Sequence, residues 1–288
     1  MHHRFPHLAQ RMFNVPLALH PAKAEIVMAA LADRLGIAHL FNAGAPVALG
    51  NFEMDEDDRA EDRAYLVQNG VAIIPVEGCL VQKLGSLRPY SGMTGYDGIR
   101  YNFLDAWNDD DVKAIVLDID SPGGEVAGCF DLADTIFRAR GRKPIWAMLN
   151  ENAFSAAYAI ASACDQISVP RTGGTGSIGV ISMIADISKA LSEGGITVNI
   201  IQFGARKADG SEVLPLSTEA RARFQADVNT IGQLFVNTVA RNRKLKASAV
   251  AAQQATTYLG QDGLRAGLAD MVAAPDAAFR ALLKSLKT

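Results

Sequence analysis

The pattern of apolar and polar residues changes character near residue 66. Before this point, the sequence predicts one amphipathic helix, from about Pro21 to Leu35, with its apolar residues on one face. A dense acidic run from Glu53 to Arg63 follows and is typical of a solvated linker. We therefore predict an N-terminal extension, helical in its first part and ending in an acidic linker, over residues 1–66.

From residue 67 onward, short apolar runs alternate with amphipathic segments. Strands are expected at residues 71–76, 114–119, 145–149, near 167 and at 197–202, and helices at 97–107, from the glycines near 124 to about 140, and at 153–163, 186–192 and 224–239. This repeated strand–helix order predicts an α/β fold with a parallel sheet flanked by helices. We assign residues 67–274 to this domain and 275–288 to a C-terminal helical tail.

Composition narrows the possible functions without identifying one. The 288 residues are 49% hydrophobic, which is enough for a substantial core. The formal charge of −3, with no basic stripe, gives no indication of nucleic-acid binding. No run approaches the roughly 18 apolar residues of a membrane helix, and the N-terminus is not typical of a secretory signal. We therefore expect a cytoplasmic protein without membrane insertion.

The positions of histidine and cysteine argue against two common kinds of site. All five histidines lie in the first 39 residues, so the expected α/β core lacks one for a Ser-His-Asp triad or a zinc site. Cys79, Cys129 and Cys164 are far apart and are expected to be small buried residues. No metal or cofactor is expected. An acyl-transfer site in this core would need another base, and lysine can serve where burial lowers its pKa.

Four positions carry candidate chemistry. Ser121-Pro-Gly-Gly124 follows a buried strand, where α/β sheets bind ligands, and its glycines suit either an oxyanion hole or a simple tight turn. The helix expected directly after them would add its N-terminal dipole. Ser155 begins a helix of small residues and is either an N-cap or a nucleophile. Ser177 lies between glycines, and Lys207 lies in a loop where an exposed lysine is ordinary.

Together, these segments resemble the S49 serine peptidases, a family with the ClpP/crotonase-like fold. The matching stretches occur in the family's order, at Asp118–Gly124, Phe154–Tyr158, Thr175–Val180, Gly204–Asp209 and Tyr258–Asp270. The resemblance covers roughly residues 71–272 and implies the same fold here.

The resemblance implies a Ser-Lys dyad, with Ser155 as nucleophile and Lys207 as general base. Ser177 matches the family serine that positions the lysine. The oxyanion hole is assigned to Gly123, Gly124 and the N–H of Ala156. The dyad positions are 52 residues apart, which suits members that carry the dyad in one domain. Alanines replace the glycines usual after the nucleophile, a departure that bears on the width of the substrate channel.

A narrower resemblance concerns Met12–Leu17 and Pro89–Ile99, which are similar to stretches of lambda-type phage prohead proteases. It implies a polypeptide substrate, suspected to be a scaffold or capsid protein, and action in the host cytoplasm or the prohead. The family also implies a homo-oligomer, a ring in which neighbouring subunits help to form the site. Three alternatives stay open: a cytoplasmic signal-peptide-peptidase-like protease, a crotonase-type acyl-CoA enzyme using Glu125 or Asp120, and a non-catalytic capsid component.

Overall fold

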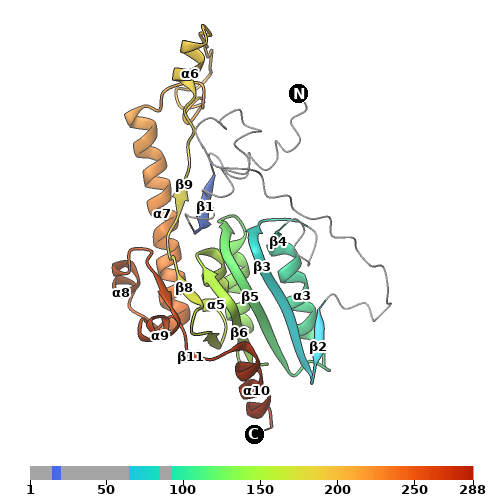
Figure 1. The fold of residues 1–288 in the computed structure, drawn as a ribbon. Coiled ribbons are helices and arrows are strands. Elements are labelled where there is room, and N and C mark those ends of the chain that lie inside the picture. The colour runs from blue at the N-terminus through green and yellow to red at the C-terminus, as the bar shows by residue number, and fades with distance from the viewer. Residues whose placement is uncertain (1–14, 21–64, 85–91, 288) are drawn as a thin grey trace, which may run out of the picture.

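The computed structural model describes residues 15–20, 65–84 and 92–287. The helix expected at residues 21–35 and the acidic run lie outside the described residues, as does part of the 89–99 stretch. The described part is an α/β structure in which helices flank a mostly parallel sheet, and this confirms the predicted fold class (Figure 1). The predicted domain boundaries stay predictions.

Eleven strands of the described residues join in one sheet. They are β1 (Pro16–Leu19), β2 (Leu66–Gln68), β3 (Val71–Val81), β4 (Met93–Gly95), β5 (Ala114–Glu125), β6 (Ile145–Phe154), β7 (Gln166–Val169), β8 (Gly174–Gly176), β9 (Ile181–Ser182), β10 (Thr257–Leu259) and β11 (Met271–Val272). The pairs β3–β5, β5–β6 and β6–β7 are parallel, whereas β1 pairs with both β5 and β9 in antiparallel register.

The described helices flank this sheet and extend from it (Figure 1). They are α3 (Tyr96–Asn108), α4 (Cys129–Ala139), α5 (Ala156–Ser162), α6 (Ser188–Glu193), α7 (Thr218–Arg243), α8 (Ala247–Ala252), α9 (Gly260–Arg265) and α10 (Pro275–Ser285). The helix predicted over residues 224–239 is therefore part of a longer one, α7, which begins at an N-cap where Ser217 Oγ accepts the N–H of Ala220.

Alternate residues of the central strands are buried on opposite faces of the sheet. In β5, Ile115 and Leu117 belong to the main core with α3, α4, α5 and α7. Ala114 and Val116 pack instead in a second cluster with α10. Both faces of the strand are covered, which explains why its sequence is a continuous apolar run.

The expected turn at Ser121-Pro-Gly-Gly124 is wrong, because β5 continues through it to Glu125. The strand continues because Gly124 pairs with Leu80 of β3 on one side and with Ala18 of β1 on the other. The expectation of a helix directly after the glycines is also wrong, since α4 begins only at Cys129. The helix whose N-terminus lies beside these glycines is α5.

Residues 181–217 form an arm that rises from the body of the molecule beside the upper part of α7 (Figure 1). The strand predicted at residues 197–202 is wrong, because these residues are not in a strand. Of their apolar side chains, Val198 is half-buried, Ile200 is exposed and Ile201 is fully exposed, and Phe203 just after them is fully exposed as well. The arm is attached to α7 by an ion pair in which Arg223 Nε lies 2.8 Å from Asp209 Oδ2.

Candidate active site

Ser155 lies at the junction between β6 and α5 in a conformation that few residues adopt. Its φ is +54°, a value that costs energy for a residue with a side chain and persists only where the surroundings fix it. Its N–H donates to the Gly176 carbonyl at 2.9 Å, and its own carbonyl accepts the N–H of Ala159 at 3.0 Å. The side chain does not cap α5. A strained serine between a strand and a helix is typical of a nucleophile rather than of an N-cap.

The Ser155 hydroxyl points toward the segment that follows β8. Its Oγ lies 3.4 Å from the Gly179 carbonyl oxygen, at the long limit of a hydrogen bond. Ser177 lies in the same segment, with a φ of +55° and with its N–H donating to the Thr256 carbonyl at 3.0 Å. Both serines are buried. Among the described residues, the Ser177 hydroxyl has no hydrogen-bond partner.

The two glycines at the end of β5 lie beside Ser155. A Cβ on Gly123, whose φ is +99°, would lie 3.0 Å from the Ser155 Cβ. A Cβ on Gly124 would lie 1.8 Å from the Leu80 carbonyl oxygen, so the close approach of β3 already requires glycine there. Ala156 is the first residue of α5, and its N–H is one of the donors that a helix start leaves without an intrahelical partner.

The structure does not bring Lys207 to Ser155 within one chain. Lys207 is exposed in the stretch of the arm between α6 and α7. Among the described residues, no hydrogen bond or ion pair links its side chain to either serine. One chain thus brings together Ser155, Ser177, Gly123, Gly124 and Ala156, and it does not bring Lys207 to them.

A row of polar residues joins β5 to β6 just before Ser155; of these only Asp120 had a candidate role from the sequence, as an acid/base in the acyl-CoA alternative. Asp118 accepts a hydrogen bond from Asn150 Nδ2 at 2.5 Å, and Asp120 accepts one from the N–H of Asn152 at 3.2 Å. Burial, and then the charges of Glu77 and Asp120, raise the pKa of Asp118 to about 6. These bonds join β5 to the last residues of β6 before Ser155. Two alternations in the sequence, Asp-x-Asp at the end of one expected strand and Asn-x-Asn after the next, were the signal for them.

The residues that the structure describes hold no cluster of three or more histidine, cysteine or carboxylate side chains placed for a metal ion. Cys129 and Cys164 are buried, and Cys79 is half-buried. Burial raises the pKa of Cys129 to about 12, so this group is a neutral thiol at physiological pH.

Among the described helices, none combines the length and the apolar character needed to cross a bilayer.

Comparisons with known proteins match the chain over most of its length. The model of peptidase family S49 matches residues 138–288, which include Ser155, Ser177 and Lys207. The chain is 40% identical to head-tail preconnector protein GP5 of Enterobacteria phage P21, over 96% of this chain and 57% of that protein. It is also 40% identical to capsid assembly protease C of Escherichia phage lambda, over 92% of this chain and 62% of that protein.

A more distant similarity is to a putative signal peptide peptidase SppA of Enterococcus faecium. The identity is 29%, over 61% of this chain and 52% of that protein. The chain spans about three fifths of the length of the two phage relatives.

Proposed function

This chain belongs to peptidase family S49, and from that membership we propose that it is a serine endopeptidase with Ser155 as nucleophile and Lys207 as general base. The observation that carries the proposal is the strained Ser155 junction, held between the glycines of β5 and the segment of Ser177. Nucleophiles occupy such strained strand-to-helix junctions because the geometry exposes the hydroxyl to a substrate carbonyl.

The chemistry is acyl transfer in two halves. Lys207 in its neutral form takes the proton of the Ser155 hydroxyl, and Oγ attacks the scissile carbonyl. The N–H groups of Gly124 and Ala156 hold the resulting oxyanion. Lys207 then gives the proton to the leaving amine, and a water molecule repeats the sequence on the acyl-enzyme. The Ser177 hydroxyl receives a hydrogen bond from the lysine when it is charged and so positions it.

The lysine comes from a neighbouring copy of the chain. Two observations support this part of the proposal. Lys207 is exposed on the arm without a contact to Ser155 of its own chain, and fully exposed Ile201 and Phe203 lie on the same arm. Large apolar side chains that a single chain leaves in water mark an interface between proteins. A homo-oligomeric ring in which each arm reaches the next subunit satisfies both observations.

The substrates are proteins of capsid assembly, a scaffold or capsid protein, cleaved in the host cytoplasm or within the prohead. The 40% identity to the lambda capsid assembly protease over 92% of this chain supports this choice. The alternative is a signal-peptide-peptidase-like role, which the more distant SppA relative supports. Cleavage of a co-expressed phage scaffold protein, compared with cleavage of signal peptides by the same preparation, distinguishes the two roles.

Mixing two inactive variants tests the shared site. Ser155→Ala and Lys207→Ala should each reduce peptide cleavage at least 1,000-fold, because removing a catalytic nucleophile or base has effects of this order. When the two variants are co-assembled in equal amounts, roughly a quarter of the wild-type activity should return. This follows because a randomly mixed ring pairs an intact Ser155 with an intact Lys207 at about one interface in four.

Lys189→Ala is the matched control, because Lys189 is an exposed lysine of the same arm, in a surface ion pair with Glu193. It should cleave at the wild-type rate. Lys207→Ala that cleaves as fast as wild type would remove lysine from the mechanism. A mixture that stays inactive while each variant assembles normally would place both dyad members in one chain.

A further inference from the structure

The N-terminal strand β1 lies between the end of β5 and β9, directly beside Ser155. On one side, Leu17, Ala18 and Leu19 pair with Glu125, Gly124 and Gly123. On the other side, Pro16 and Leu17 pair with Ser182 and Ile181. The His20 ring stacks on Phe154, the residue before Ser155, with ring centroids 5.1 Å apart. An extended five-residue segment therefore crosses the candidate active site by main-chain pairing.

The register places the Ala18 carbonyl at the candidate oxyanion hole. The N–H of His20 donates to the Pro122 carbonyl at 2.9 Å, and the N–H of Val126 donates to the Pro16 carbonyl at 3.5 Å. Opposed residues in an antiparallel ladder alternate between bonded and non-bonded pairs, so Ala18 and Gly124 form a bonded pair between these two. The Gly124 N–H then points at the Ala18 carbonyl oxygen.

A second measurement places the same oxygen beside the nucleophile. The position that a Cβ on Gly123 would take is 2.2 Å from the Ala18 carbonyl oxygen and 3.0 Å from the Ser155 Cβ. The carbonyl of Ala18 thus lies where the carbonyl of a scissile bond would lie, and the next peptide bond in the segment is Ala18–Leu19.

The side chains of β1 fill the groove as those of a bound peptide would. Ala18 is completely buried and faces the main core. Leu17 and Leu19 are buried on the other face, in a small apolar cluster with Cys79, Ile181 and Met183.

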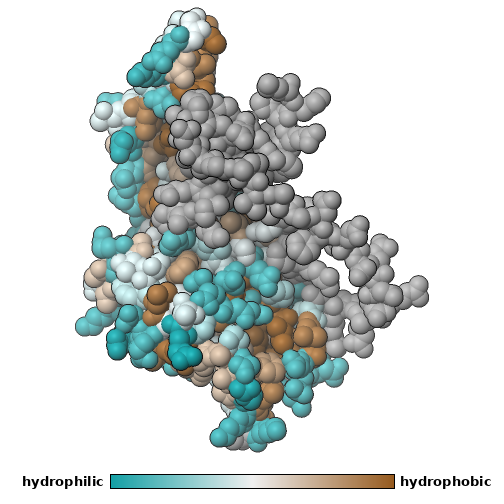
Figure 2. All heavy atoms as spheres, in the orientation of Figure 1, coloured by the Kyte–Doolittle hydropathy of each residue, from teal (hydrophilic) through white to brown (hydrophobic). Residues whose placement is uncertain are grey.

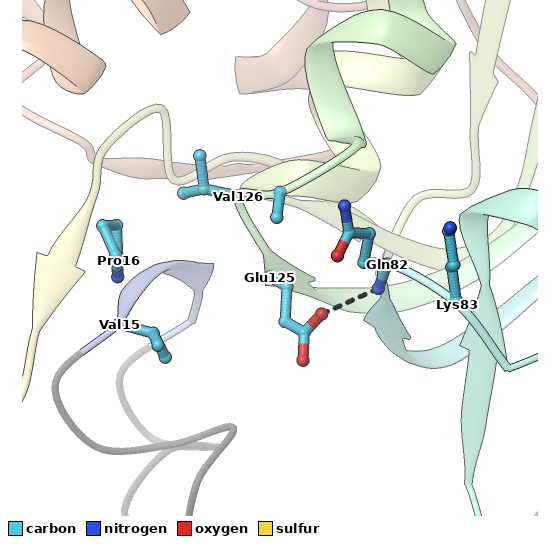
Figure 3. A pocket seen from close by; sticks show the side chains of 7 residues that line it. Val15, Pro16, Gln82, Lys83, Glu125 and Val126 are labelled. Atoms are coloured by element: carbon cyan, nitrogen blue, oxygen red, sulfur yellow. Dashed lines mark hydrogen bonds between the residues drawn. The ribbon is translucent and has the colours of Figure 1, made fainter.

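The groove continues beyond Pro16 as a cavity of about 490 Å³, lined by Val15, Gln82, Lys83, Glu125 and Val126 (Figure 3). Figure 3 shows Val15 and Pro16 across this space from Glu125, whose carboxylate accepts the N–H of Gln82 at 2.7 Å. A peptide longer than β1 could therefore extend past it.

We propose that residues 16–20 are an internal pseudosubstrate that occupies the peptide groove of this protein and must leave before a substrate is cut. The proposal rests on the proposed peptidase function. Its physical basis is mutual exclusion, because the Gly124 N–H that bonds Ala18 is the donor that a substrate oxyanion needs. The occupant also indicates what the groove accepts: an extended segment with a small residue at the scissile carbonyl and leucine-sized residues on both sides of it.

An engineered disulfide tests whether β1 must leave. Leu17 and Ile181 are direct antiparallel partners, and such Cα pairs, about 4.5–5.5 Å apart, are within disulfide range. The variant Leu17→Cys/Ile181→Cys, made with Cys79→Ser to prevent mispairing, should cleave an apolar peptide at least tenfold more slowly when oxidised than when reduced. Wild type, treated with the same reductant, should not change. Equal rates for the oxidised and reduced variant would overturn the proposal.

A second experiment releases β1 instead of locking it. It measures the reactivity of a cysteine thiol, so it does not require peptidase activity. In Leu17→Asp/Leu19→Asp, two carboxylates replace buried leucines, so β1 should leave the groove. Cys79, which packs against both leucines, should then react with a thiol reagent at least tenfold faster than in wild type, while Cys129 and Cys164 are fully buried and stay silent. A synthetic peptide of residues 15–20 should slow the reaction again. Leu66→Asp, at an exposed leucine of β2, is the matched control and should leave the rate unchanged.

The two readouts separate the possible failures. If no form of the protein cleaves any peptide, the peptidase proposal fails, while peptide-dependent protection of Cys79 still supports the occupied groove. If the released variant is folded and its Cys79 reacts at the wild-type rate, or the peptide gives no protection, β1 is a permanent strand of the sheet and the pseudosubstrate proposal is wrong.

Discussion

Asp118 is a residue at which burial opposes ionisation. Its pKa is raised to about 6 in the folded chain, from an ordinary value of 3.8, by burial and by the nearby charges of Glu77 and Asp120. Between about pH 4 and pH 6, Asp118 is therefore more protonated in the folded state than in the unfolded state. Its contribution to stability is full below this window and is lost as the pH rises through it.

Asp118→Asn should therefore stabilise the protein at pH 8 relative to wild type, and the advantage should shrink toward pH 4. The amide keeps a hydrogen-bond acceptor for Asn150 and removes the buried charge. Urea denaturation at pH 4.5, 6 and 8 measures the difference in the free energy of unfolding. Asp110→Asn, at a carboxylate whose side chain is 98% exposed, should show no such trend. A constant difference at all three pH values would contradict the prediction.

At the scale of single residues, the sequence predicted where Ser155 and Gly124 lie better than it predicted why each residue is needed there. Ser155 is the residue before α5, as the sequence suggested for either an N-cap or a nucleophile, and only the positive φ separates these interpretations. Gly124 was singled out for its bare N–H, yet the close approach of Leu80 also requires glycine there. The Asp-x-Asp and Asn-x-Asn alternations mark polar positions on two strands, but the register of β5 and β6 decides that Asp118 meets Asn150.

At the scale of elements, a hydrogen bond from Tyr158 joins α5 to the residues that follow α9. Its hydroxyl donates to the Leu268 carbonyl at 2.9 Å, and both residues are fully buried. Tyr158→Phe should lower the free energy of unfolding by about 1–3 kcal/mol, because it leaves a buried carbonyl without its donor. Denaturant unfolding measures the loss. Tyr101→Phe, at an exposed tyrosine of α3, should change stability by less than about 0.5 kcal/mol, and equal losses in both variants would contradict this account.

The sequence predicted those strands correctly whose apolar residues are buried within this chain. The runs that became β3, β5 and β6 were recognised because both faces of each strand are covered within the chain. The run at residues 197–202 has the same β-branched character, yet most of its side chains face solvent and it forms no strand. An apolar pattern indicates that a segment is suited to burial, but it does not indicate whether the same chain covers it. β1 escaped notice because four residues carry too short a pattern.

At the scale of the whole molecule, the arm is the feature that a single chain does not explain. Apolar side chains lie along it in Figure 2, and Ile196, Ile200, Ile201 and Phe203 are its exposed large apolar residues. Ile201→Ser/Phe203→Ser should therefore reduce the molar mass of the assembly and lower peptidase activity at least tenfold, with the fold of the subunit intact. Light scattering after size exclusion and circular dichroism measure the two properties.

Leu66→Ser is the control for this prediction, since Leu66 is a large apolar residue that is also exposed, but on β2 at the other end of the molecule (Figure 1). It should leave mass and activity unchanged. An arm variant with the wild-type mass would show that these side chains serve something other than assembly of this chain.

The separation of Lys207 from Ser155 of the same chain has a consequence for the reaction rate. If each complete site needs Ser155 from one chain and Lys207 from the next, the rate per subunit depends on how many subunits have met. In dilute solution, below the dissociation constant of the contact, total cleavage then rises with a power of protein concentration greater than one. On this proposed shared site, newly made chains would stay inactive while they are scarce, and proteolysis would start abruptly wherever many copies are confined in a small volume.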